Sequence, residues 1–250
     1  MATILYLSPG VGGTPERKAV LEAFANSCLT NSTNRVFVAG VDEGPVSIES
    51  SIEGELSVKG MLKKAIQLKG QYDAVIIGCT DDPGIFSLRE LLDVPVVGPF
   101  ETSFAMASVL GDSYGVITTT DSTLPETRMI LRKYGVSDHC RSLRAVNFTV
   151  AELNDKDAKE NIVKAFIREA RLAVADGAAT IVLGCMSLAM LRVDELVKNE
   201  IPAPVINPIK VSVKMAEMLV SLGLKQSVLS YPHPDMQKLA NTLLPELKSD

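Results

Sequence analysis

Two stretches of the chain, Val75-Ile76-Ile77-Gly78-Cys79 and Ile181-Val182-Leu183-Gly184-Cys185, share one pattern at a separation of about a hundred residues. Each is a short apolar run that ends in glycine and cysteine, which predicts a buried strand followed by a turn. A second match follows in each copy, Pro95-Val96-Val97-Gly98-Pro99 and Pro204-Val205-Ile206-Asn207-Pro208, and an apolar helical segment comes after it. The chain therefore contains an internal duplication.

Short apolar runs alternate with segments of helical period, which is the pattern of parallel strands joined by crossover helices. The predicted strands are Thr3 to Leu7, Arg35 to Ala39, Ala74 to Ile77, Val94 to Val97, Tyr114 to Thr118, Ala145 to Thr149, Thr180 to Leu183 and Ala203 to Ile206. Between them, helical spacing predicts Pro15 to Leu29, Val58 to Leu68, Glu126 to Lys133, Lys156 to Ala175 and Val211 to Leu222, with a helix after each cysteine of the duplication.

Eight strands suit either a barrel or two sheets of four, and the duplication favours two sheets. We therefore predict an α/β fold of two pseudo-symmetric halves, each a four-stranded parallel sheet flanked by helices. The predicted first half comprises residues 1–97 and 208–250, and the second half comprises residues 98–207.

Composition excludes several classes of protein. With 250 residues and 46% hydrophobic content, the chain can bury a large core. A net charge of -5 without a Lys/Arg block argues against nucleic acid as a partner. The apolar start, Met1 to Leu7, lacks a basic region and stops at Ser8-Pro9-Gly10, so we expect no membrane contact and a cytoplasmic location. The four cysteines never form a CxxC pair, so we expect no metal site.

Cys79 and Cys185 are the candidate catalytic residues. Ligands of parallel sheets bind outside the carboxyl ends of the strands, and in a duplicated fold these ends would face one another across a cleft. A single cysteine in this position is more simply a small buried hydrophobe. Two cysteines at matched positions are poorly explained by packing, which would accept alanine or valine, so we favour a functional pair.

Two opposed thiols have a specific chemistry. A helix N-terminus after each cysteine would lower the thiol pKa from about 8.5, so that one group is a thiolate and the other a thiol. The thiolate can remove a proton from a stereogenic carbon while the thiol returns one to the opposite face, which is two-base racemisation. Because loop amides can stabilise the enolate and the sequence has no P-loop or GxGxxG motif, we expect no cofactor.

Three segments, Gly78 to Gly84, Leu183 to Ser187 and Gly44 to Glu49, make the chain resemble the Asp/Glu/hydantoin racemase superfamily, and within it the hydantoin or allantoin racemase branch. The resemblance implies two flavodoxin-like halves with the active site in the cleft between them. It implies cofactor-independent racemisation of a 5-substituted hydantoin or a related cyclic ureide such as allantoin, with Cys79 and Cys185 as the acid/base pair.

The resemblance also implies substrate contacts from the loop after the first strand of each half and from the residues after each cysteine. From the residues themselves we add Ser47, which follows a predicted strand, and Met186, which can form an apolar wall. The predicted substrate-binding residues are Pro9, Gly10, Ser47, Thr80, Thr118, Thr119, Met186 and Ser187. Family members usually carry Asn-Pro-Asn where this chain has Ser8-Pro9-Gly10, which removes two side-chain amides from the first loop.

Other polar residues have simpler interpretations. Asp81 and Asp82 before Pro83-Gly84 favour a turn and helix cap over general acid/base catalysis. His139, beside Cys140, favours a solvated loop, and His233 favours a loop in the C-terminal tail. Cys28 lies on the apolar stripe of the first predicted helix and is expected in the core.

Alternative functions stay open at this stage. An amino-acid racemase or a maleate cis-trans isomerase would use the same two thiols, whereas a malonate decarboxylase needs only one. A protein that binds a small molecule without catalysis would have two unreactive thiols. We expect a small-molecule substrate as the partner, and homo-oligomerisation is compatible with the sequence.

Overall fold

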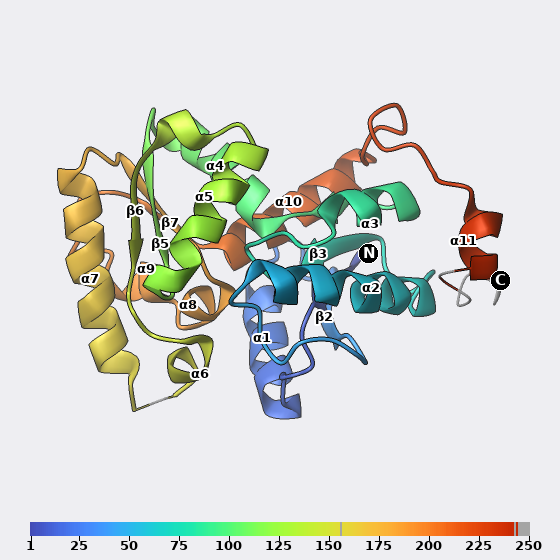
Figure 1. The fold of residues 1–250 in the computed structure, drawn as a ribbon, viewed down its shortest axis with the longest axis horizontal. Coiled ribbons are helices and arrows are strands. Elements are labelled where there is room, and N and C mark those ends of the chain that lie inside the picture. The colour runs from blue at the N-terminus through green and yellow to red at the C-terminus, as the bar shows by residue number, and fades with distance from the viewer. Residues whose placement is uncertain (156, 243, 245–250) are drawn as a thin grey trace. The chain divides into compact units, whose positions relative to one another are not determined.

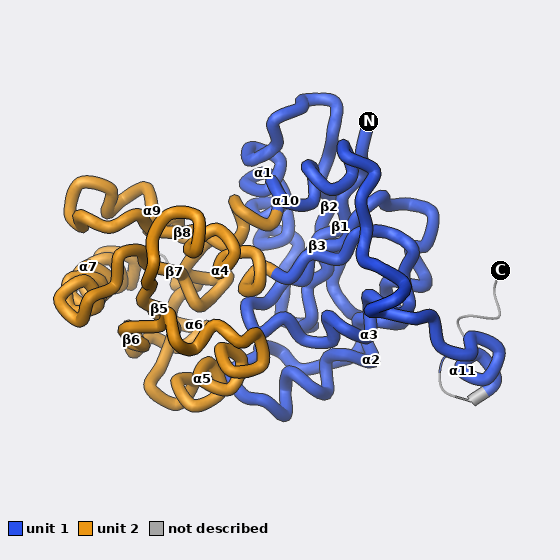
Figure 2. Tube along the Cα trace, turned by 90° about the horizontal axis from the view of Figure 1, so that it is seen from above, with its two compact units in different colours: residues 1–98, 213–250 blue, residues 99–212 orange. Residues whose placement is uncertain are grey.

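The computed structural model describes residues 1–155, 157–242 and 244. The chain separates into two compact units, unit 1 with Met1–Gly98 and Val213–Asp250 and unit 2 with Pro99–Ser212 (Figure 2). Each unit contains one four-stranded sheet, and all strand pairs are parallel. The predicted α/β fold of two four-stranded parallel sheets flanked by helices is therefore confirmed.

Unit 1 has the strand order β2-β1-β3-β4. Its strands are β1 (Thr3–Ser8), β2 (Arg35–Gly40), β3 (Ala74–Ile77) and β4 (Val96–Val97), and its helices are α1 (Pro15–Ser27), α2 (Ser51–Gln67), α3 (Ile85–Leu91), α11 (Met236–Thr242) and the second part of α10 (Pro208–Leu222). Leu7 and Ile77 of adjacent strands point to one face, where they pack with Met61 of α2 and Leu88 of α3. In Figure 2, α1 and α10 lie on the opposite face from α2 and α3.

Unit 2 repeats this topology with the order β6-β5-β7-β8. Its strands are β5 (Tyr114–Thr118), β6 (Cys140–Ala145), β7 (Thr180–Leu183) and β8 (Val205–Ile206), and its helices are α4 (Pro99–Leu110), α5 (Leu124–Lys133), α6 (Val150–Leu153), α7 (Lys159–Ala175), α8 (Met186–Met190), α9 (Val193–Leu196) and the first part of α10. Figure 1 shows α7 on one side of the sheet and α4 and α5 on the other. Phe104 of α4 and Leu131 of α5 pack against Val116 and Val182 of the central strands.

The predicted strand Ala145 to Thr149 is wrong. The structure places β6 at Cys140–Ala145, and Asn147 then has a left-handed backbone with φ of 60°. The physical reason is that β6 is an edge strand, so polar side chains suit its exposed side. Arg144, for example, forms ion pairs with Glu169 at 3.3 Å and Asp176 at 2.7 Å. The apolar pattern from Ala145 onward belongs instead to the turn that leaves the sheet.

Several predicted boundaries also shift. The strands β4 and β8 contain only two residues each, so they begin later than predicted. Helix α2 begins at Ser51 and not at Val58, because Glu53 accepts hydrogen bonds from the Glu49 N–H and the Ser50 hydroxyl and so anchors a polar first turn. Lys156, the predicted start of the long helix, lies outside the described residues, and α7 begins at Lys159.

In the described part of the chain, no helix combines the length and apolar character needed to cross a bilayer.

Candidate active site

Gly78 and Gly184 bring the two cysteines to the same topological position in their sheets. The Gly78 N–H donates to the carbonyl of Leu7 at the end of β1, and the Gly184 N–H donates to that of Ile117 in β5, both at 2.8 Å. A Cβ atom on Gly78 would lie 2.8 Å from the Leu7 oxygen, and one on Gly184 would lie 2.9 Å from Val116 Cγ1. Only glycine fits this approach between adjacent strands. The next residue in each unit is a cysteine at the carboxyl end of the strand.

Cys79 is half-buried and begins a turn, not a helix. The Asp82 N–H donates to the Cys79 carbonyl at 3.2 Å, and Asp82 and Gly84 have φ values of 47° and 67°. Helix α3 starts only at Ile85. The predicted helix after Cys79 is therefore present as α3, but the left-handed turn separates it from the cysteine, so Cys79 does not cap its N-terminus.

Cys185 is also half-buried, and it is the N-cap residue of α8. Its sulfur accepts the Ser187 N–H at 3.3 Å, and its carbonyl accepts the Ala189 N–H at 3.1 Å. A backbone N–H that points at sulfur interacts more strongly with a thiolate than with a thiol. For Cys185 the predicted helix start is present.

In unit 1, the structure gathers three of the predicted substrate-binding residues around Cys79. A Cβ atom on Gly78 would lie 3.0 Å from Ser8 Cα, so the loop with Pro9 and Gly10 lies beside the cysteine turn. Thr80, which is buried, follows Cys79 directly.

The loop that carries Ser47 packs against the first loop of unit 1. The Val11 N–H donates to the Pro45 carbonyl at 2.9 Å, and a Cβ atom on Gly10 would lie 3.0 Å from the Val46 oxygen. Glycine is needed at Gly10 for this close approach of two backbones. Ser47 is partly buried and donates a hydrogen bond to Glu49 at 3.2 Å. The two loops thus form one structural unit.

In unit 2, the other predicted residues lie around Cys185. Thr118 is buried, and its hydroxyl lies 3.3 Å from the Gly184 carbonyl, to which it donates, and 3.2 Å from the Thr123 hydroxyl. Thr119 is buried next to it. Met186 and Ser187, both buried, form the first turn of α8. Each unit therefore places one thiol beside the loop that follows its central strand.

Asp82, predicted to lie in a turn and to cap a helix, does lie in the turn after Cys79, but it does not cap α3. The N-cap of α3 is Gly84, whereas the Asp82 side chain is fully buried. A Cβ atom on Gly98 would lie 2.7 Å from Asp82 Oδ2, so the carboxylate occupies the space beside this glycine. The sequence held one signal for this arrangement, because the other copy of the repeat has Asn207 where this copy has Gly98.

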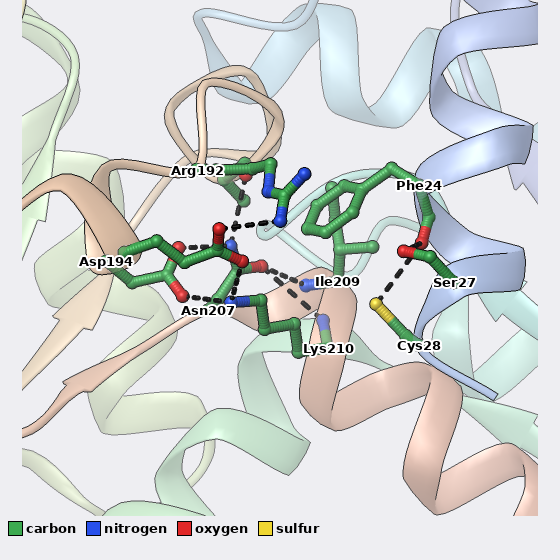
Figure 3. A network of polar contacts seen from close by, with 10 residues as sticks. Phe24, Ser27, Cys28, Arg192, Asp194, Asn207, Ile209 and Lys210 are labelled. Carbon is green, nitrogen blue, oxygen red and sulfur yellow. Dashed lines mark hydrogen bonds and ion pairs between the residues drawn. The ribbon is translucent and has the colours of Figure 1, made fainter. Parts of the chain in front are cut away.

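The remaining sulfur and imidazole groups have local partners. Cys28 is half-buried, not in the core, because it lies just beyond α1, where its Sγ donates to the Phe24 carbonyl at 3.3 Å (Figure 3). Cys140 donates to the Ser142 carbonyl, and burial raises the pKa of its thiol. His139 and His233 are both exposed, and each ring contacts a backbone carbonyl. The described residues contain no cluster of three or more His, Cys, Asp or Glu side chains able to hold a metal ion.

The two matched sheets, each with a Gly-Cys pair at the end of a central strand, define an α/β protein built on a duplicated unit. Residues 4–216 match the family described as Asp/Glu/Hydantoin racemase, and the chain belongs to this family. It is accordingly an isomerase of the racemase class. The resemblance noted in the sequence is thereby confirmed.

Two kinds of relative refine the comparison. The chain is 35% identical to a hydantoin racemase of Rhizobium meliloti, over 85% of this chain and 88% of that protein. Its structure is similar to that of an allantoin racemase from Klebsiella pneumoniae, with a TM-score of 0.84, 27% identity and 94% of each chain covered. An allantoin racemase from Pseudomonas fluorescens gives a TM-score of 0.83 and 28% identity, over 93% of this chain and 97% of that chain.

Proposed function

We propose that this enzyme racemises a five-membered cyclic ureide, either a 5-substituted hydantoin or allantoin, and that Cys79 and Cys185 are its two acid/base groups. The observation that carries the proposal is the equivalence of the two corners. In each unit a glycine binds the carbonyl at the end of the central strand, and a cysteine follows it. The names of the relatives, hydantoin racemase and allantoin racemase, support the substrate class.

The proposed reaction requires only two proton transfers at one carbon. One sulfur, as thiolate, takes the proton from the stereogenic carbon next to the ring carbonyl, and the electron pair moves into that carbonyl to form an enolate. The other sulfur, as thiol, gives its proton to the opposite face of the same carbon. After one turnover the protonation states of the two cysteines are exchanged, so the product of one direction leaves the enzyme ready for the other enantiomer. This chemistry needs no cofactor when backbone amides stabilise the enolate oxygen.

The loops beside each cysteine are the proposed substrate contacts. In unit 1 they are Pro9, Gly10, Ser47 and Thr80, and in unit 2 they are Thr118, Thr119, Met186 and Ser187. A cyclic ureide presents ring N–H donors and carbonyl acceptors. Loop backbone and the hydroxyl groups of Ser47 and Thr119 can pair with both kinds of group. Met186 would contact the substituent on the ring carbon.

The proposal is tested by incubating one enantiomer of a 5-substituted hydantoin, and separately of allantoin, in deuterium oxide. Polarimetry follows loss of optical rotation, and mass spectrometry follows deuterium incorporation at the reacting carbon. We expect Cys79→Ser and Cys185→Ser each to lower the racemisation rate by at least about a hundredfold, because serine is a much weaker acid than cysteine. Cys28→Ser and Cys140→Ser are matched controls that we expect to retain activity.

Full activity in either Cys79→Ser or Cys185→Ser would contradict the two-thiol mechanism. Racemisation of neither substrate by the wild-type chain, with activity on aspartate, glutamate or maleate, would contradict the substrate class and leave the mechanism to be measured on the new substrate.

A further inference from the structure

Asn207 is a buried amide at the end of β8 that holds two elements of unit 2. Its Oδ1 accepts the N–H groups of Ile209 at 3.0 Å and Lys210 at 3.4 Å, so it caps the N-terminus of α10. Its Nδ2 donates to the carbonyl of Ala189 in α8 at 3.0 Å and to Asp194 Oδ1 at 2.7 Å. Figure 3 shows Asn207 beside Asp194 and Lys210. The Asn207 side chain therefore donates two hydrogen bonds and accepts two, which is its full capacity.

The bond to Ala189 connects Asn207 with Cys185. Ala189 is the fourth residue after Cys185, and its N–H donates to the Cys185 carbonyl at 3.1 Å. The peptide plane that follows carries the carbonyl that Asn207 holds. Helix α8 has only five residues, too few to be stable by itself. The Ser187 N–H that points at the Cys185 sulfur belongs to this short helix, so its direction depends on what anchors α8.

An ion-pair cluster fixes the donor end of Asn207. Lys210 Nζ lies 2.5 Å from Asp194 Oδ2 and 2.7 Å from Glu195 Oε1, and Arg192 pairs with Glu195 at 2.6 Å. The Asp194 side chain is 9% exposed, so its contact with Asn207 is shielded from water. Because Asp194 accepts one amide hydrogen, the other is directed at Ala189.

Unit 1 has a different arrangement at the equivalent position, the residue after its fourth strand. Gly98 occupies the repeat position of Asn207, and the space beside it holds the buried carboxylate of Asp82, three residues after Cys79. Both units therefore place one buried polar side chain between the cysteine segment and the end of the fourth strand. In unit 2 it comes from the strand, and in unit 1 it comes from the cysteine turn.

We propose that Asn207 is a positioning residue for Cys185. Its hydrogen bond to the Ala189 carbonyl fixes the orientation of α8, and this orientation keeps the Ser187 N–H directed at the Cys185 sulfur. This role rests on the proposed function of Cys185, but its test reads the thiol itself. Asn207 touches no reacting atom in this scheme. It acts through α8.

The experiment measures the rate of iodoacetamide alkylation of each cysteine in the full chain as a function of pH. Mass spectrometry of the digested protein identifies which cysteine has been alkylated. Asn207→Ser keeps a good N-cap for α10 and cannot reach Ala189. We expect it to move the midpoint of the Cys185 profile upward by about one pH unit, because loss of the Ser187 N–H contact removes a group that stabilises the thiolate. The midpoint of Cys79, in the same molecules, should stay unchanged.

Two further variants make the result decisive. Ser113→Ala removes part-buried hydrogen bonds with Gly177 and Ala179 at the opposite end of β5, so it destabilises unit 2 without touching α8. We expect this control to lower the melting temperature and leave both midpoints in place. Asn207→Thr also keeps a side-chain oxygen that can cap α10 and cannot reach Ala189, and it replaces Asn207→Ser if that variant does not fold; the expected shift has the same direction.

An unchanged Cys185 midpoint in the Asn207 variants would overturn the positioning role. Equal shifts at Cys79 and Cys185 would also overturn it, because they would indicate general loosening. Failure of the proposed function is distinguishable, since it would appear as absent racemisation by wild-type protein whatever the alkylation profile shows.

Discussion

At the scale of single residues, the proposed site depends on Gly78 and Gly184 as well as on the two cysteines that follow them. Gly78 lies so close to β1 that an added methyl group would meet a backbone oxygen, which cannot move aside as a side chain can. The same corner sets the direction of the thiol in the next residue. Substitution there should therefore affect both stability and activity.

We expect Gly78→Ala to destabilise the protein by about 1–3 kcal/mol through overpacking against Leu7 and Tyr6. Thermal unfolding followed by circular dichroism measures this change. Gly54→Ala is the contrasting variant. Gly54 lies in helix α2, and a Cβ atom there would make only an ordinary contact with Ile48 at 3.9 Å. It should stabilise by about 0.5–1 kcal/mol. Equal effects of the two substitutions would contradict the importance of the strand contact.

At the scale of elements, the short edge strand β4 is covered by a side chain. Gln226 accepts the Val96 N–H at 2.9 Å and donates to the Val96 carbonyl at 3.0 Å, so its amide imitates a paired strand. Arg89 also donates to this carbonyl and contacts the Tyr231 hydroxyl at 3.2 Å. The segment after α10 thus satisfies backbone groups that an edge strand otherwise exposes.

We expect Gln226→Ala to cost about 1–3 kcal/mol, because it leaves the Val96 N–H without this partner. Hydrogen–deuterium exchange should show faster exchange of the Val96 amide, while amides of β1 keep their protection. Lys225→Ala is the matched control, since its ion pair with Asp93 is 48% and 74% exposed and contributes little. Unaltered exchange at Val96 in the Gln226 variant would argue against the capping role.

At the scale of the whole molecule, unit 1 is assembled from both ends of the chain. The chain leaves unit 1 after Gly98 and returns to it within α10. Glu217 on α10 binds the turn after α1, accepting the N–H groups of Thr30 at 2.8 Å and Asn31 at 2.9 Å and the amide of Asn34 at 2.9 Å. One buried carboxylate thereby joins the N-terminal and C-terminal parts of unit 1.

This contact makes stability depend on pH in the acidic range. Burial raises the pKa of Glu217, but the hydrogen bonds from Asn31, Thr30 and Asn34 outweigh it and lower the pKa from 4.5 to about 2. Because the folded state favours the charged form, the stabilisation is complete above pH 4.5 and is lost as pH falls toward 2. We expect Glu217→Gln to lower the free energy of unfolding at neutral pH by roughly 2–3 kcal/mol.

Urea denaturation at a series of pH values measures the effect. The difference between wild type and Glu217→Gln should shrink as pH decreases below 4.5. Glu160→Gln, at an exposed pair with Lys164, serves as the control and should have little effect at any pH. If the free energies of unfolding of wild type and Glu217→Gln differed by the same amount at every pH, the lowered pKa of Glu217 would be contradicted.

Local patterns predicted the two sheets, because buried parallel strands are continuous apolar runs and the Gly-Cys ends recur in both. They failed at β6, where an edge strand carries Arg141 and Arg144 and lacks that signature. They predicted the turn at Asp81 to Gly84, but not that the Asp82 side chain would be buried beside Gly98, since that depends on a segment distant in sequence. The roles of the two cysteines stay predictions.

Sequence by itself determined the duplication, the class of fold and the family, since all three depend on the order of apolar residues, glycines and cysteines along the chain. Only the tertiary structure decided which polar groups are buried and what they hold, as with Asp82 beside Gly98 and Asn207 on Ala189. The physical reason is that burial and hydrogen-bond partners are set by neighbours distant in sequence. No local pattern contains them.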